Sequence, residues 1–307
     1  MIAELVLPYP FDLAFMQRAL VACIAVGAFA PTIGVFLVQK RLSLIGDGIG
    51  HLAFSGVAGG ILIGVWPVWS ALAVAVVGAI AVDRLRARGR ASGDLALALF
   101  FYGGIALGVV LIGLAGSLNA NLFSYLFGQV LLVTPDEVVT ILVLGAVVVG
   151  TMAVLRRAMF AVVSDEEWAR VAGLPVDLLN SVLAILTAFV IVAAMRVVGI
   201  LLIAALMVLP VGAAQLIARS FAGTLRWSAA IGVGAVVAGL ALSRIVGLAP
   251  GGTIVLVAAV LFAAISLVAA RRSPDRALRS VALHRERDSA TAPASSVGSV
   301  LGDSHSR

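Results

Sequence analysis

The chain has 307 residues, of which 62% are hydrophobic and 12% are charged, and its formal net charge is +6. A soluble domain carries about 25% charged residues, so this composition excludes a globule with an ordinary polar surface. The basic residues stand in short clusters between apolar runs. This distribution excludes a nucleic-acid-binding face and fits the excess of Lys and Arg on cytoplasmic loops.

Nine apolar segments follow one another along the chain. Most are close to the length of about 18 to 25 residues with which a helix crosses a hydrocarbon core of about 30 Å. Some neighbouring segments could be two halves of one broken helix. We therefore predict an all-α, polytopic transmembrane bundle of about 8–10 spans, with apolar segments at 14–38, 47–64, 67–83, 94–114, 137–155, 177–195, 197–218, 226–246 and 251–270.

The stretch 115–136 breaks this series. It is too short and too interrupted for a full span with two loops, and it ends in the helix-start signal Thr134-Pro135-Asp136. Irregular backbone at membrane depth is tolerated only where protein buries it or where it lines a cavity. We predict an outward loop with a short, partly inserted helix.

The basic residues also predict an orientation. Most of them fall on one side of the predicted bundle, and the other side receives Arg18, Arg196 and Arg244. The rich side is cytoplasmic by the positive-inside rule. We expect a multi-pass protein of the plasma (inner) membrane, with a permease domain at 1–272. Residues 273–307 have little apolar pattern and predict a disordered cytoplasmic tail.

Asp47 and His51 are the acid and the histidine that fall inside an apolar segment. They are four residues apart, so a helix places both on one face. The other two histidines, His284 and His305, belong to the polar tail. An ionisable group at membrane depth costs at least about 2.5 kcal/mol and usually faces a cavity or an ion path.

Three interpretations of this pair remain open from the residues alone. A hydrogen-bonded Asp47–His51 pair could brace two helices, the two groups could relay protons, or they could hold a transition metal transiently, since carboxylate and imidazole both bind such ions. Gly56, Gly60 and Gly64 repeat beside the stripe that Asp47 and His51 form with Ser55. Small residues at this spacing predict a close contact with another helix.

The stretch "RLSLIGDGIGHLAFSGVAGG" resembles the signature of the membrane permeases of ATP-binding-cassette (ABC) importers for zinc and manganese. The matching residues are Lys40, Arg41, Ser43, Gly46, Asp47, His51, Gly56, Val57 and Ala58. The resemblance continues in order through 93–113, 126–138, 165–180 and 196–219, and it spans roughly residues 10 to 270.

The resemblance implies a fold similar to that of vitamin and siderophore permeases, and a homodimer. It also implies two cytoplasmic ABC ATPase subunits and an extracytoplasmic metal-binding protein as partners. By the same resemblance, Asp47 and His51 are the metal contacts of the translocation path. The segment 211–225, after Pro210, is the first expected docking site for the ATPase, and 165–175 is the second.

The chain itself is not expected to be an enzyme. A Walker A motif needs Gly-Lys-Ser/Thr, and the one lysine, Lys40, stands between Gln39 and Arg41. No HExxH motif is present, and Ser55 near His51 is weak support for an intramembrane enzyme. We expect no tightly bound cofactor, and zinc, manganese or iron as the transported ion. The alternative function is a secondary metal/proton transporter with Asp47 and His51 as its proton relay.

Overall fold

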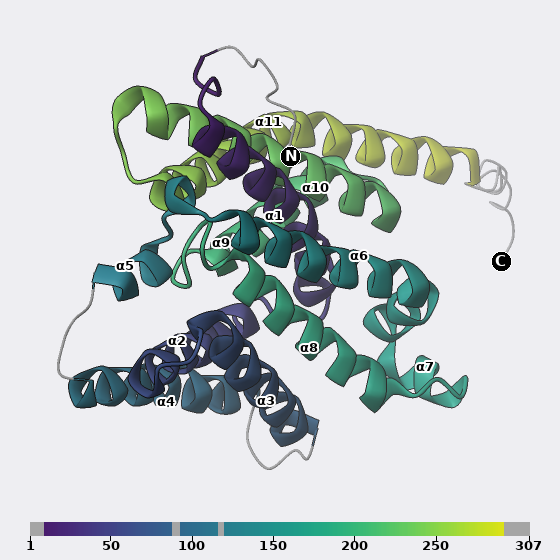
Figure 1. Cartoon of the computed structure of the whole chain (residues 1–307). Helices are drawn as coiled ribbons and strands as arrows, with labels where there is room; N and C mark the ends of the chain where they lie inside the picture. The colour runs from purple at the N-terminus through teal and green to yellow at the C-terminus, as the bar shows by residue number, and fades with distance from the viewer. Residues whose placement is uncertain (1–8, 88–92, 116–119, 292–307) are drawn as a thin grey trace, which may run out of the picture. The chain divides into compact units, whose positions relative to one another are not determined.

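The structure is a computed structural model that describes residues 9–87, 93–115 and 120–291. These residues form eleven α-helices and one short 3-10 helix (Figure 1). Eight of the helices are long and apolar enough to cross a membrane. They are α1 (Ala14–Gln39), α2 (Ile45–Ile63), α3 (Pro67–Ala87), α4 (Gly93–Leu114), α6 (Pro135–Ser164), α8 (Val176–Ala194), α10 (Phe221–Val246) and α11 (Pro250–Thr291).

Shorter helices complete the described chain: α5 (Ala120–Phe127), the 3-10 helix η1 (Val130–Leu132), α7 (Glu166–Val171) and α9 (Ile203–Ile217). Helix α9 is apolar but has only 15 residues. The eight long helices and α9 correspond one by one to the nine predicted segments, so the predicted all-α bundle is confirmed. The predicted short helix within 115–136 is α5.

Residues 197–202 depart from the prediction, which placed them in an apolar helix. Their main chain turns, and α9 begins only at Ile203. The amide of Ile200 donates to the carbonyl of Tyr125 at 3.0 Å, and the amide of Leu201 donates to that of Leu126 at 3.3 Å. Because these backbone groups pair with the end of α5, they are satisfied without a helix. Hydropathy alone does not reveal such a partner.

Two glycines make this pairing possible. Gly128 and Gly199 have φ values of +73° and +95°, a region that residues with a side chain rarely adopt. A Cβ at Gly199 would lie 2.4 Å from the carbonyl oxygen of Leu126, and one at Gly128 would lie 2.6 Å from the carbonyl carbon of Val198. The two backbones therefore meet without side chains between them.

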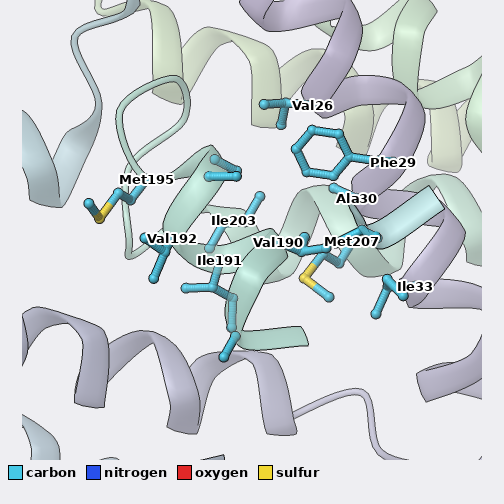
Figure 2. Close-up of a cluster of buried hydrophobic side chains, with 14 of the residues drawn as sticks. Val26, Phe29, Ala30, Ile33, Val190, Ile191, Val192, Met195, Ile203 and Met207 are labelled. Atoms are coloured by element: carbon cyan, nitrogen blue, oxygen red, sulfur yellow. The ribbon is translucent and has the colours of Figure 1, made fainter. Parts of the chain in front are cut away.

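A cluster of buried apolar side chains joins α1, α8 and α9 (Figure 2). In a bilayer such a cluster stabilises the bundle through packing, since lipid tails are as apolar as the side chains. Its labelled members are each at most 2% exposed: Val26, Phe29, Ala30, Ile33, Val190, Ile191, Val192, Met195, Ile203 and Met207.

The helix ends meet in two groups. The end of α1 contacts α7 and α8 through Lys40, which forms an ion pair with Glu166 at 3.0 Å, and Asp83 near the end of α3 accepts a hydrogen bond from Ser181 of α8 at 2.7 Å. At the opposite end of α8, Arg196 donates to Ser124 of α5 at 2.9 Å. The connections between helices therefore lie at opposite ends of the bundle, as expected when successive helices cross a membrane in opposite directions.

The chain divides into two compact units, Met1–Ile265 and Ser266–Arg307. Helix α11 begins in the first unit and continues to Thr291 in the second. Residues 292–307 of the predicted tail lie outside the described residues. The predicted division at residue 272, the disordered tail and the cytoplasmic position of the C-terminus stay predictions.

Replacing Gly199 with Ala should lower the free energy of unfolding by at least about 2 kcal/mol, because the new Cβ meets backbone and the positive φ is strained. Thermal unfolding of the detergent-solubilised protein measures this loss. The control is Gly150→Ala in α6, where nothing lies within 4 Å of the new Cβ. Helix propensity predicts a gain of up to about 1 kcal/mol there, and equal melting temperatures of the two variants would contradict the pairing of 197–202 with α5.

Candidate site on helix α2

Asp47 and His51 lie on one side of α2, as the sequence predicted. Asp47 belongs to the first turn of this helix, and His51 lies one turn further in. Both side chains are half-buried.

Helix α4 passes very close to His51. A Cβ at Gly104 of α4 would lie 2.8 Å from the carbonyl carbon of His51 and 2.9 Å from the amide nitrogen of Leu52. The ring of Phe101, also on α4, meets the imidazole edge to face, with ring centroids 4.3 Å apart. The contact with α4 therefore holds the main chain of His51 in place, and Phe101 covers one side of the imidazole ring. No pattern in the sequence pointed to Phe101, since an apolar aromatic residue in a span is ordinary.

The predicted close contact beside the polar stripe is confirmed for Gly56 and Gly60. A Cβ at Gly56 would lie 2.7 Å from the Cα of Ala71, and one at Gly60 would collide with the side chain of Ser70, both on α3. Gly64 was wrongly placed in this contact. It has a φ of +72° and ends α2 as its C-cap, with nothing within 4 Å of a built Cβ.

Ser55 differs from the other two members of the stripe. It is buried, and its hydroxyl donates to the carbonyl of Leu52 at 2.8 Å within the same helix. Among the described residues, by contrast, neither the Asp47 nor the His51 side chain takes part in a hydrogen bond or an ion pair. This disfavours an Asp47–His51 brace within one chain, because a brace would hold both groups in hydrogen bonds.

Two ligands do not close a metal site. No group of three or more His, Cys, Asp or Glu side chains occurs in the described part of the chain. A structural zinc site has four protein ligands, whereas an ion that must pass on is held loosely. The pair can offer one carboxylate and one imidazole to a passing ion, with water or a second chain completing the coordination.

A buried ion pair at the other end of the bundle was missed in the sequence. Arg196 Nε lies 2.7 Å from Glu137 Oε1, with side chains 14% and 9% exposed, and the guanidinium stacks over Tyr125 at 4.8 Å. Glu137 also completes the capping box with Thr134 that begins α6. The ion pair ties α6 to the 195–202 turn. Its partners are 59 residues apart, so spacing along the chain could not reveal it.

The two segments expected to dock on an ATPase differ in exposure. Residues 211–225 form the last turns of α9, a short connection and the first turn of α10, and Val211, Ala213 and Ala214 are fully buried. Residues 165–175 contain α7, which is anchored by Ala169.

Comparison with known proteins covers nearly the whole first unit. The model of the ABC 3 transport family matches residues 12–269. The manganese transport system membrane protein MntC of Halalkalibacterium halodurans is 33% identical over 251 residues, which are 81% of this chain and 86% of that protein.

Two solved structures share the fold. A chain of PsaBC from Streptococcus pneumoniae, solved in complex with Fab, superposes with a TM-score of 0.76 at 31% identity, covering 83% of this chain and 91% of that one. An inward-facing ABC transporter of the metal-chelate type superposes with a TM-score of 0.62 at 15% identity, covering 85% and 91%. The second match supports the architecture only.

Replacing Gly104 with Val should destabilise the contact between α4 and α2 by about 1–3 kcal/mol, the usual effect of overpacking, and should displace His51. Gly103→Val is the matched control, because nothing lies within 4 Å of a Cβ at that position. Thermal unfolding of both purified variants measures the difference. Equal melting temperatures would show that α4 does not press on His51.

Proposed function

Because this chain belongs to the ABC 3 transport family, we propose that it is the membrane permease of an ATP-driven importer of divalent transition metal ions. The permease is the membrane subunit of such a transporter and not its ATPase. In the proposed cycle the path opens alternately to either side, and ATP binding at the partner subunits drives the change. Family membership disfavours the secondary metal/proton transporter considered as the alternative.

The observation that carries the path assignment is the unpaired state of Asp47 and His51. Among the described residues they lie together on one side of α2 without hydrogen bonds or ion pairs of their own. Keeping two polar groups unpaired at membrane depth is unfavourable unless they meet water or an ion. We therefore place both side chains in the translocation path, where each holds the ion briefly.

Manganese is the first cargo we propose, and zinc is the second. The MntC relative is named as a manganese transport protein. Carboxylate oxygen suits manganese, and imidazole accepts manganese as well as zinc. An extracytoplasmic binding protein, which the transporter class implies, would deliver the ion and add most of the selectivity. A second copy of the chain would supply the remaining ligands of the path.

Helix α7 is the docking site for the ATPase that the geometry favours. Val171 and Trp168 are 88% and 61% exposed, although both are apolar. Ala169 is the buried residue that anchors α7. Exposed apolar side chains on a loop helix are typical of a contact with another protein. The 211–225 segment, ranked first from the resemblance, becomes the second candidate because its start is buried in the bundle at Val211, Ala213 and Ala214, and its large apolar residues Leu216 and Ile217 are less exposed, at 46% and 40%.

Replacing Asp47 or His51 with Ala should reduce accumulation of Mn²⁺ by at least about tenfold, because each change removes a ligand contact of about 1.5–3 kcal/mol. The measurement is uptake of radioactive Mn²⁺ into proteoliposomes that hold the permease with its ATPase, with the binding protein outside. Ser55→Ala is the control, since Ser55 lies one turn further on the same face but bonds only its own helix.

Normal uptake by both variants would remove Asp47 and His51 from the path. If Ser55→Ala reduced Mn²⁺ uptake as much as the Asp47 and His51 variants, this face of α2 would matter for helix packing and not for binding the ion. Uptake that survives without ATP but disappears with the proton gradient would restore the secondary transporter.

Replacing Val171 with Asp should reduce the amount of ATPase that co-purifies with the permease by at least about tenfold, the effect of losing one interface residue worth about 2 kcal/mol. Ala222→Asp, at the exposed start of α10 in the second candidate segment, should have the smaller effect. The reverse order would return the main docking role to 211–225.

A further inference from the structure

A pocket of about 590 Å³ lies where the ends of α1 and α3 meet α7 and the start of α8. Its lining includes three acidic side chains, Asp83, Glu166 and Asp177, and three basic ones, which are Lys40, Arg86 and Arg170. The charges therefore balance, and the pocket does not select an anion or a cation. Its polar side chains bond chiefly to one another, which points to a role in joining helices.

Lys40 is the centre of this network. Its ammonium group donates to Glu166 Oε2 of α7 at 3.0 Å and also to the amide oxygen of Asn180 on α8. The Asn180 amide nitrogen donates in turn to Glu166 Oε1 at 3.2 Å. The three side chains form a closed triangle that connects the end of α1 with α7 and α8.

Burial gives this triangle its stiffness. The Lys40 side chain is only 12% exposed, whereas that of Glu166 is 44% exposed. Because Glu166 is partly exposed, the attraction between the two charges is screened by solvent and by itself adds little to stability. A mostly buried ammonium group that loses its carboxylate partner is strongly unfavourable even when the amide oxygen of Asn180 remains, so Lys40 is expected to follow Glu166 when α7 moves.

The chain between Lys40 and α2 is short and tightly turned. The amide of Leu42 donates to the carbonyl of Leu37 at 2.8 Å, and the amide of Arg41 donates to that of Val38 at 3.0 Å. This is a Schellman motif with Arg41 at φ +57°, where glycine is usual. The amide of Ile45, the first residue of α2, then donates to the carbonyl of Leu42 at 3.0 Å. A displacement of Lys40 is therefore passed to the start of α2.

We propose that Lys40 is the positioning residue that transmits movement of α7 to α2, and thereby to Asp47 and His51. This inference rests on the proposed function, in which α7 meets the ATPase and α2 carries the path. Lys40–Glu166 is the one ion pair between α7 and the α1–α2 turn in the described ranges. The other side-chain contacts of α7 described above, Arg170 with Asp177 at 3.1 Å and Glu166 with Asn180 at 3.2 Å, lead to α8.

The test uses the complete transporter in proteoliposomes and measures Mn²⁺ ions imported per ATP hydrolysed. Lys40→Met should assemble with the ATPase and keep its basal ATP hydrolysis, while the ratio falls at least about fivefold, the lower end of typical coupling between sites. Glu166→Gln, on the exposed side of the pair, should lower the ratio in the same way. Exchanging the charges, Lys40→Glu together with Glu166→Lys, should restore most of it.

Ser181→Ala is the matched control. It removes the hydrogen bond to Asp83 at 2.7 Å, which joins α3 to α8 beside the same pocket without touching α7, and it should leave the ratio unchanged. A normal ratio in Glu166→Gln, an equal loss in Ser181→Ala, or no recovery in the exchanged pair would each overturn the proposal. Absence of ATP-driven Mn²⁺ import by the unaltered transporter would instead refute the proposed function.

Discussion

Helices α3 and α4 bring their main chains against α2, at Gly56 and Gly60 on one side and at Gly104 on another. Any larger residue at these points would separate the helices, because a Cβ there already lies within 3 Å of atoms on the neighbouring helix. In lipid such contacts hold a bundle together, since no hydrophobic effect acts between spans. They also determine where the polar groups of α2 stand.

Asp47 and His51 gain their position from this packing. Helix α4 packs against the main chain of His51, and Phe101 covers one side of the imidazole ring. At one end of the same helix, the turn after α1 connects α2 to Lys40 and the polar pocket. At the other end of the bundle, the Arg196–Glu137 pair and the glycines of the 197–202 turn hold the irregular segments.

The sequence predicted the number and order of the helices well, because span length is set by the thickness of the bilayer. It also singled out Asp47 and His51, since an acid and a histidine rarely occur within apolar segments. It failed where a residue's role depends on a partner far along the chain. Lys40 and Glu166 are 126 residues apart, and the residues 197–202 leave the helix because α5 satisfies their backbone. Gly64 was wrongly assigned to the helix contact because, within a repeat of glycines, one that ends a helix looks the same as one that packs against another helix.

We propose that Asp47 and His51 touch the transported ion directly. Electron–nuclear double resonance of Mn²⁺ bound to the complete transporter measures this, because an imidazole nitrogen in the first coordination shell gives a hyperfine coupling that water and carboxylate do not. We expect a nitrogen coupling that disappears in His51→Ala. Mn²⁺ that binds with oxygen ligands alone, or a nitrogen coupling that persists in His51→Ala, would contradict it.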